Sequence, residues 1–288
     1  MNYRHAFHAG GFADVVKHAV LCRVLAHLCE KPAAFRVIDT HAGAGVYDLT
    51  ATEADKTGEW REGIGRLLSA QIGTDVRNLL APYLDAIAVC NSSERLTKYP
   101  GSPMIARGML RRQDRLIACE LEPRAAAALA RNLHGDARVK TIAIDGWTAL
   151  SAYVPPKERR GLVLVDPPFE QPDEFAQLAQ GFENAHRKWP TGIYLLWYPI
   201  KEPAEVLAFT RRLARSGISK ILRVELDVGP GVAPADATKL QGTGLIVVNP
   251  PWTLQNDLSR LLPVLAAVLG RDGKDRATLD WLAGEAAK

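Results

Sequence analysis

Short apolar segments alternate with longer amphipathic segments along most of the chain. Helical spacing of apolar residues marks residues 14–30, where Asp14 can cap the helix, and residues 123–134, 173–188 and 203–216. Seven apolar stretches have the length expected of buried strands: residues 35–39, 115–120, 139–144, 161–166, 193–198, 219–226 and 244–248. Strands that alternate with helices favour a parallel sheet covered on both faces, so the pattern predicts an α/β fold.

One interval interrupts this alternation. A doubly wound fold usually needs about 20 residues between its glycine turn and the next acidic strand end. Here Glu120 lies about 75 positions beyond Gly45, and the apolar spacing in between is helical. We therefore expect one domain formed by residues 1–46 and 98–288, with residues 47–97 inserted as a helical subdomain.

Composition places few limits on function. The chain is 47% hydrophobic and 24% charged, as soluble proteins are, and its net charge of +4 permits an anionic partner without requiring one. No pair of the four cysteines has CxxC spacing, so we expect reduced thiols and no metal site. No run approaches the roughly 18 apolar residues that span a bilayer. These features predict a soluble, cytoplasmic protein that does not associate with a membrane.

Residues suited to binding adenosine follow three of the predicted strands. Gly43 and Gly45 follow the first strand and let the backbone approach a ligand, although their spacing is not GxGxxG. Glu120 ends the second strand and can accept both hydroxyls of a ribose. Asp145 ends the third strand and can accept from an adenine amino group or merely cap a turn. Each residue alone has a structural explanation, but together they favour an adenosine-containing cofactor.

The most specific pattern is Asp166-Pro167-Pro168-Phe169, directly after the fourth predicted strand. Consecutive prolines restrict the loop and remove two N–H donors, so Asp166 and the Pro167 carbonyl can accept from one NH2 group while Phe169 stacks on a base. An amine on an aromatic ring needs this help because its lone pair is delocalised. Accepting its hydrogens restores nucleophilicity toward a methyl group on a sulfonium. The alternative is a rigid turn without a catalytic role.

A second segment, Asn249-Pro250-Pro251-Trp252, has the same residue types after another apolar strand. It follows the last of the predicted strands. If that strand runs antiparallel to the others, its end lies opposite the cofactor. We therefore expect a structural turn there.

At these residues the chain resembles the class I adenine-N6 methyltransferases and, more closely, the bacterial 23S rRNA (adenine-N6) methyltransferase J family. The resemblance extends over essentially the whole chain, and its N-terminal pieces are more specific than the Asp-Pro-Pro-Phe segment. The matching pieces are Tyr3–Gly10, Ala13–His18, Asp39–Gly45, Tyr99–Pro103, Asp166–Phe169 and Asn249–Trp252.

The resemblance implies a Rossmann-like class I methyltransferase fold, with a seven-stranded, mostly parallel sheet, helices on both faces and an inserted helical subdomain. It implies S-adenosylmethionine as the cofactor, Asp166 as the catalytic carboxylate that also borders the cofactor, and contact of Tyr3 with RNA. It implies a single adenine of 23S rRNA as the target. Further residues implied at the cofactor site, besides Gly43 from the glycine turn, are His18, His41, Ser102, Glu120, Asp145 and Gly146.

Contacts with RNA beyond Tyr3 are less specific. We expect a monomer that acts on naked or early-assembly 23S rRNA, because a bulged or single-stranded adenine needs no flipping from a duplex. Basic residues that could bind phosphates are Arg4, Lys17, Arg111, Arg112, Arg159 and Arg160.

Three alternatives remain open. A DNA adenine-N6 methyltransferase would share the cofactor and the chemistry, but the chain has no recognisable DNA-target domain. A nicotinamide-dependent oxidoreductase would need GxGxxG, which is missing. A non-catalytic RNA-binding protein would have no use for the Asp-Pro-Pro-Phe segment.

Overall fold

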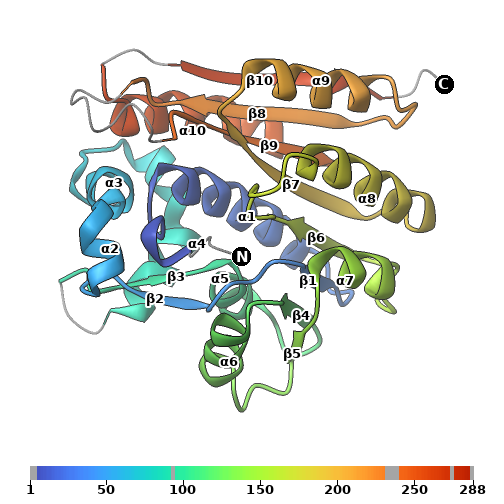
Figure 1. The fold of residues 1–288 in the computed structure, drawn as a ribbon, viewed down its shortest axis with the longest axis horizontal. Helices are drawn as coiled ribbons and strands as arrows, with labels where there is room; N and C mark the ends of the chain where they lie inside the picture. The colour runs from blue at the N-terminus through green and yellow to red at the C-terminus, as the bar shows by residue number, and fades with distance from the viewer. Residues whose placement is uncertain (1–4, 92–94, 231–239, 273–275, 286–288) are drawn as a thin grey trace.

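The computed structural model describes residues 5–91, 95–230, 240–272 and 276–285. Its main feature is an eight-stranded sheet with the order β10-β8-β9-β7-β6-β1-β4-β5, which runs from one end of the molecule to the other (Figure 1). The strands are β1 (Arg36–Asp39), β4 (Arg115–Glu120), β5 (Val139–Ala143), β6 (Gly161–Val165), β7 (Ile193–Ile200), β8 (Ile221–Asp227), β9 (Gly242–Val248) and β10 (Arg276–Ala283).

The sheet is mostly parallel, as the sequence predicts. Strands β5, β4, β1, β6 and β7 pair in parallel, whereas β9 runs antiparallel to both β7 and β8. The seven expected strands all form, and β10 is an eighth that the sequence analysis missed. Strand β10 lies at the edge of the sheet, antiparallel to β8, and none of its residues is fully buried. An edge strand of this kind has no continuous apolar run to reveal it.

Helices cover both faces of the sheet because successive strand residues point to opposite sides. Val37 packs into the larger apolar cluster, and Ile38 packs into the cluster on the other face. The helices on the first face are α1 (Phe12–Glu30), α5 (Ser102–Met109), α6 (Pro123–Asn132) and α10 (Leu254–Leu269); those on the second are α7 (Gly146–Tyr153), α8 (Glu174–Lys188) and α9 (Pro203–Ala214). No helix in the described part of the chain is long and apolar enough to cross a membrane.

Helix α1 begins two residues earlier than expected, and the predicted capping role of Asp14 is wrong. Gly11 occupies the N-cap position, so Asp14 lies inside the first turn with 2% of its surface exposed. Its Oδ2 accepts the backbone N–H of Gly10 at 3.0 Å. The side chain therefore holds the segment before the helix and faces inward, where it meets Lys17.

A helical segment interrupts the fold where the sequence predicts one. It lies between β2 (Val46–Asp48) and β3 (Lys98–Pro100), which pair as an antiparallel ribbon on one side of the molecule (Figure 1). Within it lie α2 (Thr52–Thr57), the π-helical turn η2 (Arg61–Gly65), α3 (Arg66–Ser69) and α4 (Thr74–Cys90). Helix α4 packs against α1, α5 and α10. Treating residues 47–97 as a separate subdomain remains a prediction.

Gly161 is the residue whose replacement should most directly disturb the sheet. It begins β6 opposite Arg36 of β1, and a Cβ there would overlap the Arg36 carbonyl oxygen. We expect Gly161→Ala to lower the free energy of unfolding by more than about 3 kcal/mol, measured by urea denaturation. Gly108→Ala is the control, because Gly108 lies in α5 with open space around it; it should stabilise by up to about 1 kcal/mol. Equal stabilities of the two variants would contradict this account of the β1–β6 pairing.

Candidate functional site

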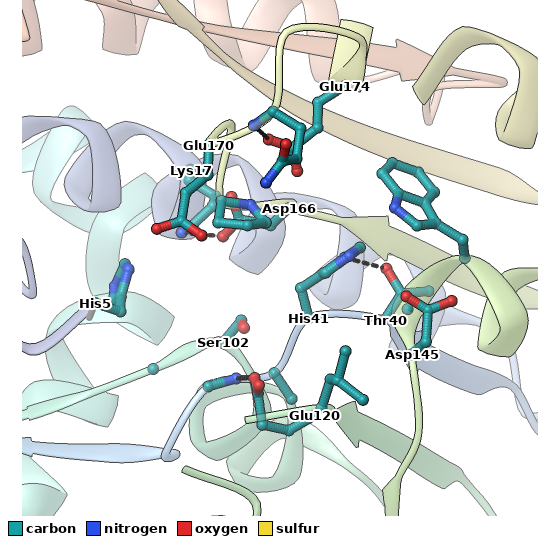
Figure 2. A pocket seen from close by; sticks show the side chains of 18 of the residues that line it. His5, Lys17, Thr40, His41, Ser102, Glu120, Asp145, Asp166, Glu170 and Glu174 are labelled. Carbon is teal, nitrogen blue, oxygen red and sulfur yellow. Dashed lines mark hydrogen bonds and ion pairs between the residues drawn. The ribbon is translucent and has the colours of Figure 1, made fainter. Parts of the chain in front are cut away.

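A cavity with about 1060 Å³ of empty space opens at the carboxyl ends of β1, β4, β5 and β6. Parallel strands bring these ends to one edge of the sheet, the usual ligand position in such folds. Figure 2 shows Lys17 and Asp166 on one side of the cavity and Ser102 and Glu120 on the other. All eight residues that the sequence analysis assigns to a cofactor line it: His18, His41, Gly43, Ser102, Glu120, Asp145, Gly146 and Asp166.

Glu120 holds the glycine turn against the end of β4. Its Oε2 accepts the backbone N–H of Gly43 at 2.8 Å, and its Oε1 accepts that of Glu122 at 2.8 Å. Gly43 has a φ of 62°, and a Cβ there would overlap the Tyr47 hydroxyl. Glycine is therefore required both by the backbone conformation and by the space available.

The end of β5, next to β4 in the sheet, forms the adjacent part of the wall. Asp145 caps α7 by accepting the Thr148 N–H at 2.8 Å, so the capping role that the sequence left open is real. The His41 ring packs against Gly146, where a Cβ would overlap it, and meets the Trp147 ring edge-on at 5.3 Å. Burial lowers the pKa of His41 to about 4, so this ring is neutral at physiological pH. Trp147 lines the cavity, although the sequence analysis did not single it out.

A buried ion-pair network connects α1 to the loop after β6. The Lys17 ammonium lies 2.8 Å from Asp14 Oδ1 and 2.5 Å from Asp166 Oδ2, and the lysine side chain is 4% exposed. Burial opposes its charge, but the two carboxylates raise the pKa of Lys17 above its ordinary value. His5 completes the network, with Nε2 3.0 Å from Asp14 Oδ2. Asp166 is therefore held by a cation that is itself buried.

Asp39, at the end of β1, is a second buried carboxylate that the sequence analysis did not select. Its Oδ2 accepts the Ser102 hydroxyl at 2.6 Å, and within the described residues its buried Oδ1 has no partner. Burial raises the pKa of Asp39 to about 7, and the charge of Asp166 adds to the rise. At the level of sequence nothing distinguishes it from any polar residue that ends a strand.

A second cavity lies on the other side of Asp166. Four residues, His5, Lys17, Asp166 and Pro168, line both cavities, so Asp166 stands where they meet. The second cavity also contains Phe169, whose ring lies 5.7 Å from that of Trp197 at the end of β7. The other residues that line it include His8, Phe12, Glu59, Pro199 and Lys201.

The structure does not place the other predicted site residues where the sequence analysis expects them, or does not describe them. Tyr3 and Arg4 lie outside the described residues. Pro167 is buried and is not among the residues that line either cavity. Lys17, expected to bind RNA phosphates, is instead buried between two carboxylates, so its charge is not presented to solvent.

Two of the arginines expected at an RNA-binding rim lie at the wrong edge of the sheet. Arg111 and Arg160 precede β4 and β6, and both donate to the Ala33 carbonyl before β1. The amino ends of these parallel strands are opposite the cavity. A rim at the mouth of the cavity cannot include these two residues.

The expected structural role of the Asn249 segment is confirmed. Strand β9 runs antiparallel to β7, so Asn249 lies beside the beginning of β7, away from the cavity. Its side-chain amide donates to the carbonyls of Pro190 and Gly192, each at 2.8 Å. The residue closes a turn, as its position after an antiparallel strand predicts.

Comparison with known proteins finds close relatives over nearly the full chain. A family model described as ribosomal RNA large subunit methyltransferase D, RlmJ, matches residues 32–283. The proteins named ribosomal RNA large subunit methyltransferase J in Haemophilus influenzae and Escherichia coli are each 39% identical over 99% of this chain and 100% of their own length. A crystal structure of a Legionella pneumophila protein superimposes with a TM-score of 0.85 at 33% identity, covering 96% of this chain and 98% of that one.

The raised pKa of Asp39 predicts how the free energy of unfolding of the ligand-free protein depends on pH. Between about pH 4 and 7 the folded state holds a proton on Asp39 that the unfolded chain has already released. This contribution is complete at low pH and is lost as the pH rises through the folded pKa, with a slope approaching about 1.4 kcal/mol per pH unit. As the pH rises through this window, wild type should lose stability that Asp39→Asn retains. Urea unfolding of both proteins at a series of pH values measures the difference. Parallel pH profiles of the two proteins would show that Asp39 is not desolvated as described.

Proposed function

This chain belongs to the ribosomal RNA large subunit methyltransferase J family of methyltransferases, and we propose that it transfers a methyl group from S-adenosylmethionine to N6 of one adenine in 23S rRNA. The observation that carries the proposal is the position of Asp166, where two cavities meet. One cavity lies at the strand ends that bind cofactors in this fold class. The other is lined by aromatic rings suited to a nucleobase.

The first cavity fits the proposed cofactor. Glu120 and Asp145 offer acceptors for the ribose and adenine, and the neutral His18 ring presents a buried nitrogen, Nε2, that has no partner in the described residues. A buried polar atom without a partner, in a residue that lines a cavity, is a candidate contact for a ligand. When bound, S-adenosylmethionine supplies an electrophilic methyl group on a sulfonium. Residues proposed to hold it are His18, His41, Gly43, Ser102, Glu120, Asp145 and Gly146.

Asp166 can prepare the target amine for attack. Lys17 occupies Oδ2, so Oδ1 is left to accept a hydrogen from an adenine N6 group in the second cavity. Phe169, which lines that cavity, is proposed as the ring that contacts the base. The Pro167 carbonyl could be the second acceptor only after a local rearrangement, because Pro167 is buried and lines neither cavity. As the amine nitrogen gains the methyl group it becomes cationic and must lose a proton, which Asp166 Oδ1 is placed to receive.

The charge of the network suits this reaction. Leaving His5 aside, Lys17 and the two carboxylates that contact it, Asp14 and Asp166, sum to one negative charge. That charge lies in a largely dehydrated region, where it favours a positive charge developing on N6. Lys17 is thus proposed as a positioning residue that orients Asp166 without cancelling the charge needed for catalysis.

The relatives favour RNA over DNA as the substrate, because both are named ribosomal RNA methyltransferases. We propose that Tyr3 and Arg4 contact this RNA. We also propose that the enzyme is a monomer and acts in the cytoplasm. The chemistry at Asp166 would serve an adenine of DNA equally well, so substrate choice depends on contacts outside the two cavities.

Replacing Asp166 tests the catalytic assignment. Asp166→Asn keeps the shape but removes the anionic acceptor, so we expect methyl transfer to fall by roughly 10²–10⁴-fold. Affinity for S-adenosylmethionine should change little. Incorporation of tritiated methyl groups into 23S rRNA fragments measures the first quantity, and isothermal titration calorimetry measures the second.

Asn249→Ala is the matched control, since it alters the similar segment on the opposite edge of the sheet. Its folded fraction should transfer methyl groups at a rate close to wild type. Near-normal turnover by Asp166→Asn, or an equally large loss in Asn249→Ala, would reject Asp166 as the acceptor.

The rate of methylation should depend on whether the RNA is naked or assembled into a subunit. A base must leave its stack to enter a cavity beside Asp166, and unstacking costs least in naked hairpins and single strands. Naked 23S rRNA fragments should therefore be methylated faster than assembled large subunits, with duplex DNA as the comparison substrate. Equal rates on subunits and stripped RNA would contradict this preference, and faster transfer to duplex DNA would contradict the proposed substrate.

A further inference from the structure

Three buried rings connect the inserted helices to the cofactor cavity. His18 Nδ1 lies 2.7 Å from the Tyr99 hydroxyl, which lies 2.9 Å from the Tyr83 hydroxyl. His18 is on α1, Tyr99 is on β3 and Tyr83 is on α4 of the helical segment. Both tyrosines are fully buried and His18 is 1% exposed. Within the described residues, Tyr99 is the hydrogen-bond partner recorded for the Tyr83 hydroxyl.

The ring and the two hydroxyls carry three hydrogens for two bonds, so the direction depends on where the remaining hydrogen can find an acceptor. Burial lowers the pKa of His18 to about 3, so the ring is neutral and carries one N–H. If Nδ1 donated to Tyr99, one of the two tyrosine hydroxyl hydrogens would be buried without an acceptor. If Tyr83 donates to Tyr99 and Tyr99 donates to Nδ1, both hydroxyl hydrogens are used, and the remaining hydrogen belongs to a residue that lines the cavity, where a ligand can accept it. The second arrangement places the hydrogen of His18 on Nε2.

Nε2 is the ring nitrogen of His18 that remains available to a ligand. It is buried, lacks a partner in the part of the chain the structure describes, and belongs to a residue that lines the cofactor cavity. Glu120 and Asp145 lie at the ends of β4 and β5, on the side assigned to adenosine. His18 follows Lys17, which binds Asp166, and its ring contacts Tyr99 of β3. We therefore assign it to the amino-acid side of the cofactor. An N–H donor there matches a carboxylate.

We infer that Tyr99, supported by Tyr83, fixes the tautomer of His18 so that Nε2–H donates to the carboxylate of the cofactor's amino-acid portion. The inference rests on the proposed function for the identity of the ligand. It assigns Tyr99 as a positioning residue and gives the helical segment a role in cofactor recognition. The opposite tautomer would present a lone pair, which suits the amino group and repels the carboxylate.

The tautomer can be read directly in the free protein. In ¹⁵N-labelled wild type, the Nε2 of His18 should show the shift of a protonated ring nitrogen and Nδ1 that of an unprotonated one. His18→Gln identifies these signals among the seven histidines. In Tyr99→Phe the ring loses the donor to Nδ1, so the two forms should mix. In Tyr83→Phe the Nε2–H form should persist, because Tyr99 can still donate. A wild-type ring protonated on Nδ1 would overturn the inference.

Binding measurements test whether the Nε2 hydrogen of His18 donates to the carboxylate of the cofactor. The probes are S-adenosylmethionine and decarboxylated S-adenosylmethionine, which differ only in the carboxylate. We expect Tyr99→Phe to raise the Kd for the first about tenfold, the range of a hydrogen bond to a charged group. The Kd for the second should change less than about twofold. Tyr83→Phe should raise the first Kd by less than Tyr99→Phe does.

Tyr194→Phe is the control for the loss of a buried hydroxyl, since Tyr194 donates to the Trp189 carbonyl at 2.9 Å, outside both cavities. It should leave both Kd values unchanged. An equal loss for the two probes in Tyr99→Phe would indicate general damage to the cavity and reject the inference. If wild type bound neither probe, the proposed function would fail, while the tautomer in the free protein would still decide the hydrogen-bond direction.

Discussion

The Lys17–Asp166 ion pair is the interaction on which the geometry of this site depends. It joins the first turns of α1 to the loop after β6 across 149 positions of sequence, at 2.5 Å. Removing Lys17 would leave Asp14 and Asp166 without the cation they share, and such a loss typically costs about 3–5 kcal/mol. The same contact decides which carboxylate oxygen remains available to a substrate. Helix α1 lies outside the strand–helix repeat and is deeply buried by its packing against α4, α5 and α10. In the proposed function it contributes both to stability and to the orientation of Asp166.

Around this pair the fold arranges two cavities with different chemistry. Parallel strands bring Glu120, Asp145 and Asp166 to one edge of the sheet, where backbone turns and helix ends are free to meet a ligand. The antiparallel β9 sends the similar Asn249 segment to the other edge. The helical segment between β2 and β3 supports α1 through α4, so its packing reaches His18 as well as the core.

Much of this arrangement can be predicted from sequence, because strand periodicity and the parallel topology together place the residues that end strands. Glu120, Asp145 and Asp166 are found in this way. Lys17 is not, since a lysine on a helix looks like a solvated one until the packing of α4, α5 and α10 around α1 is known. The sequence also predicts, wrongly, that Asp14 caps α1, because its burial inside the first turn depends on the same packing. Strand β10 was missed because its half-exposed edge leaves no apolar run.

A crystal structure of the protein with S-adenosylhomocysteine and adenosine would test the central claim most directly. The account predicts the sulfur-containing ligand in the cavity with Glu120 and Asp145, the adenine in the cavity with Phe169 and Trp197, and adenine N6 within hydrogen-bond distance of Asp166 Oδ1. The Lys17 contact to Oδ2 should persist. An adenine bound away from Asp166, or Asp166 turned out of both cavities, would contradict it.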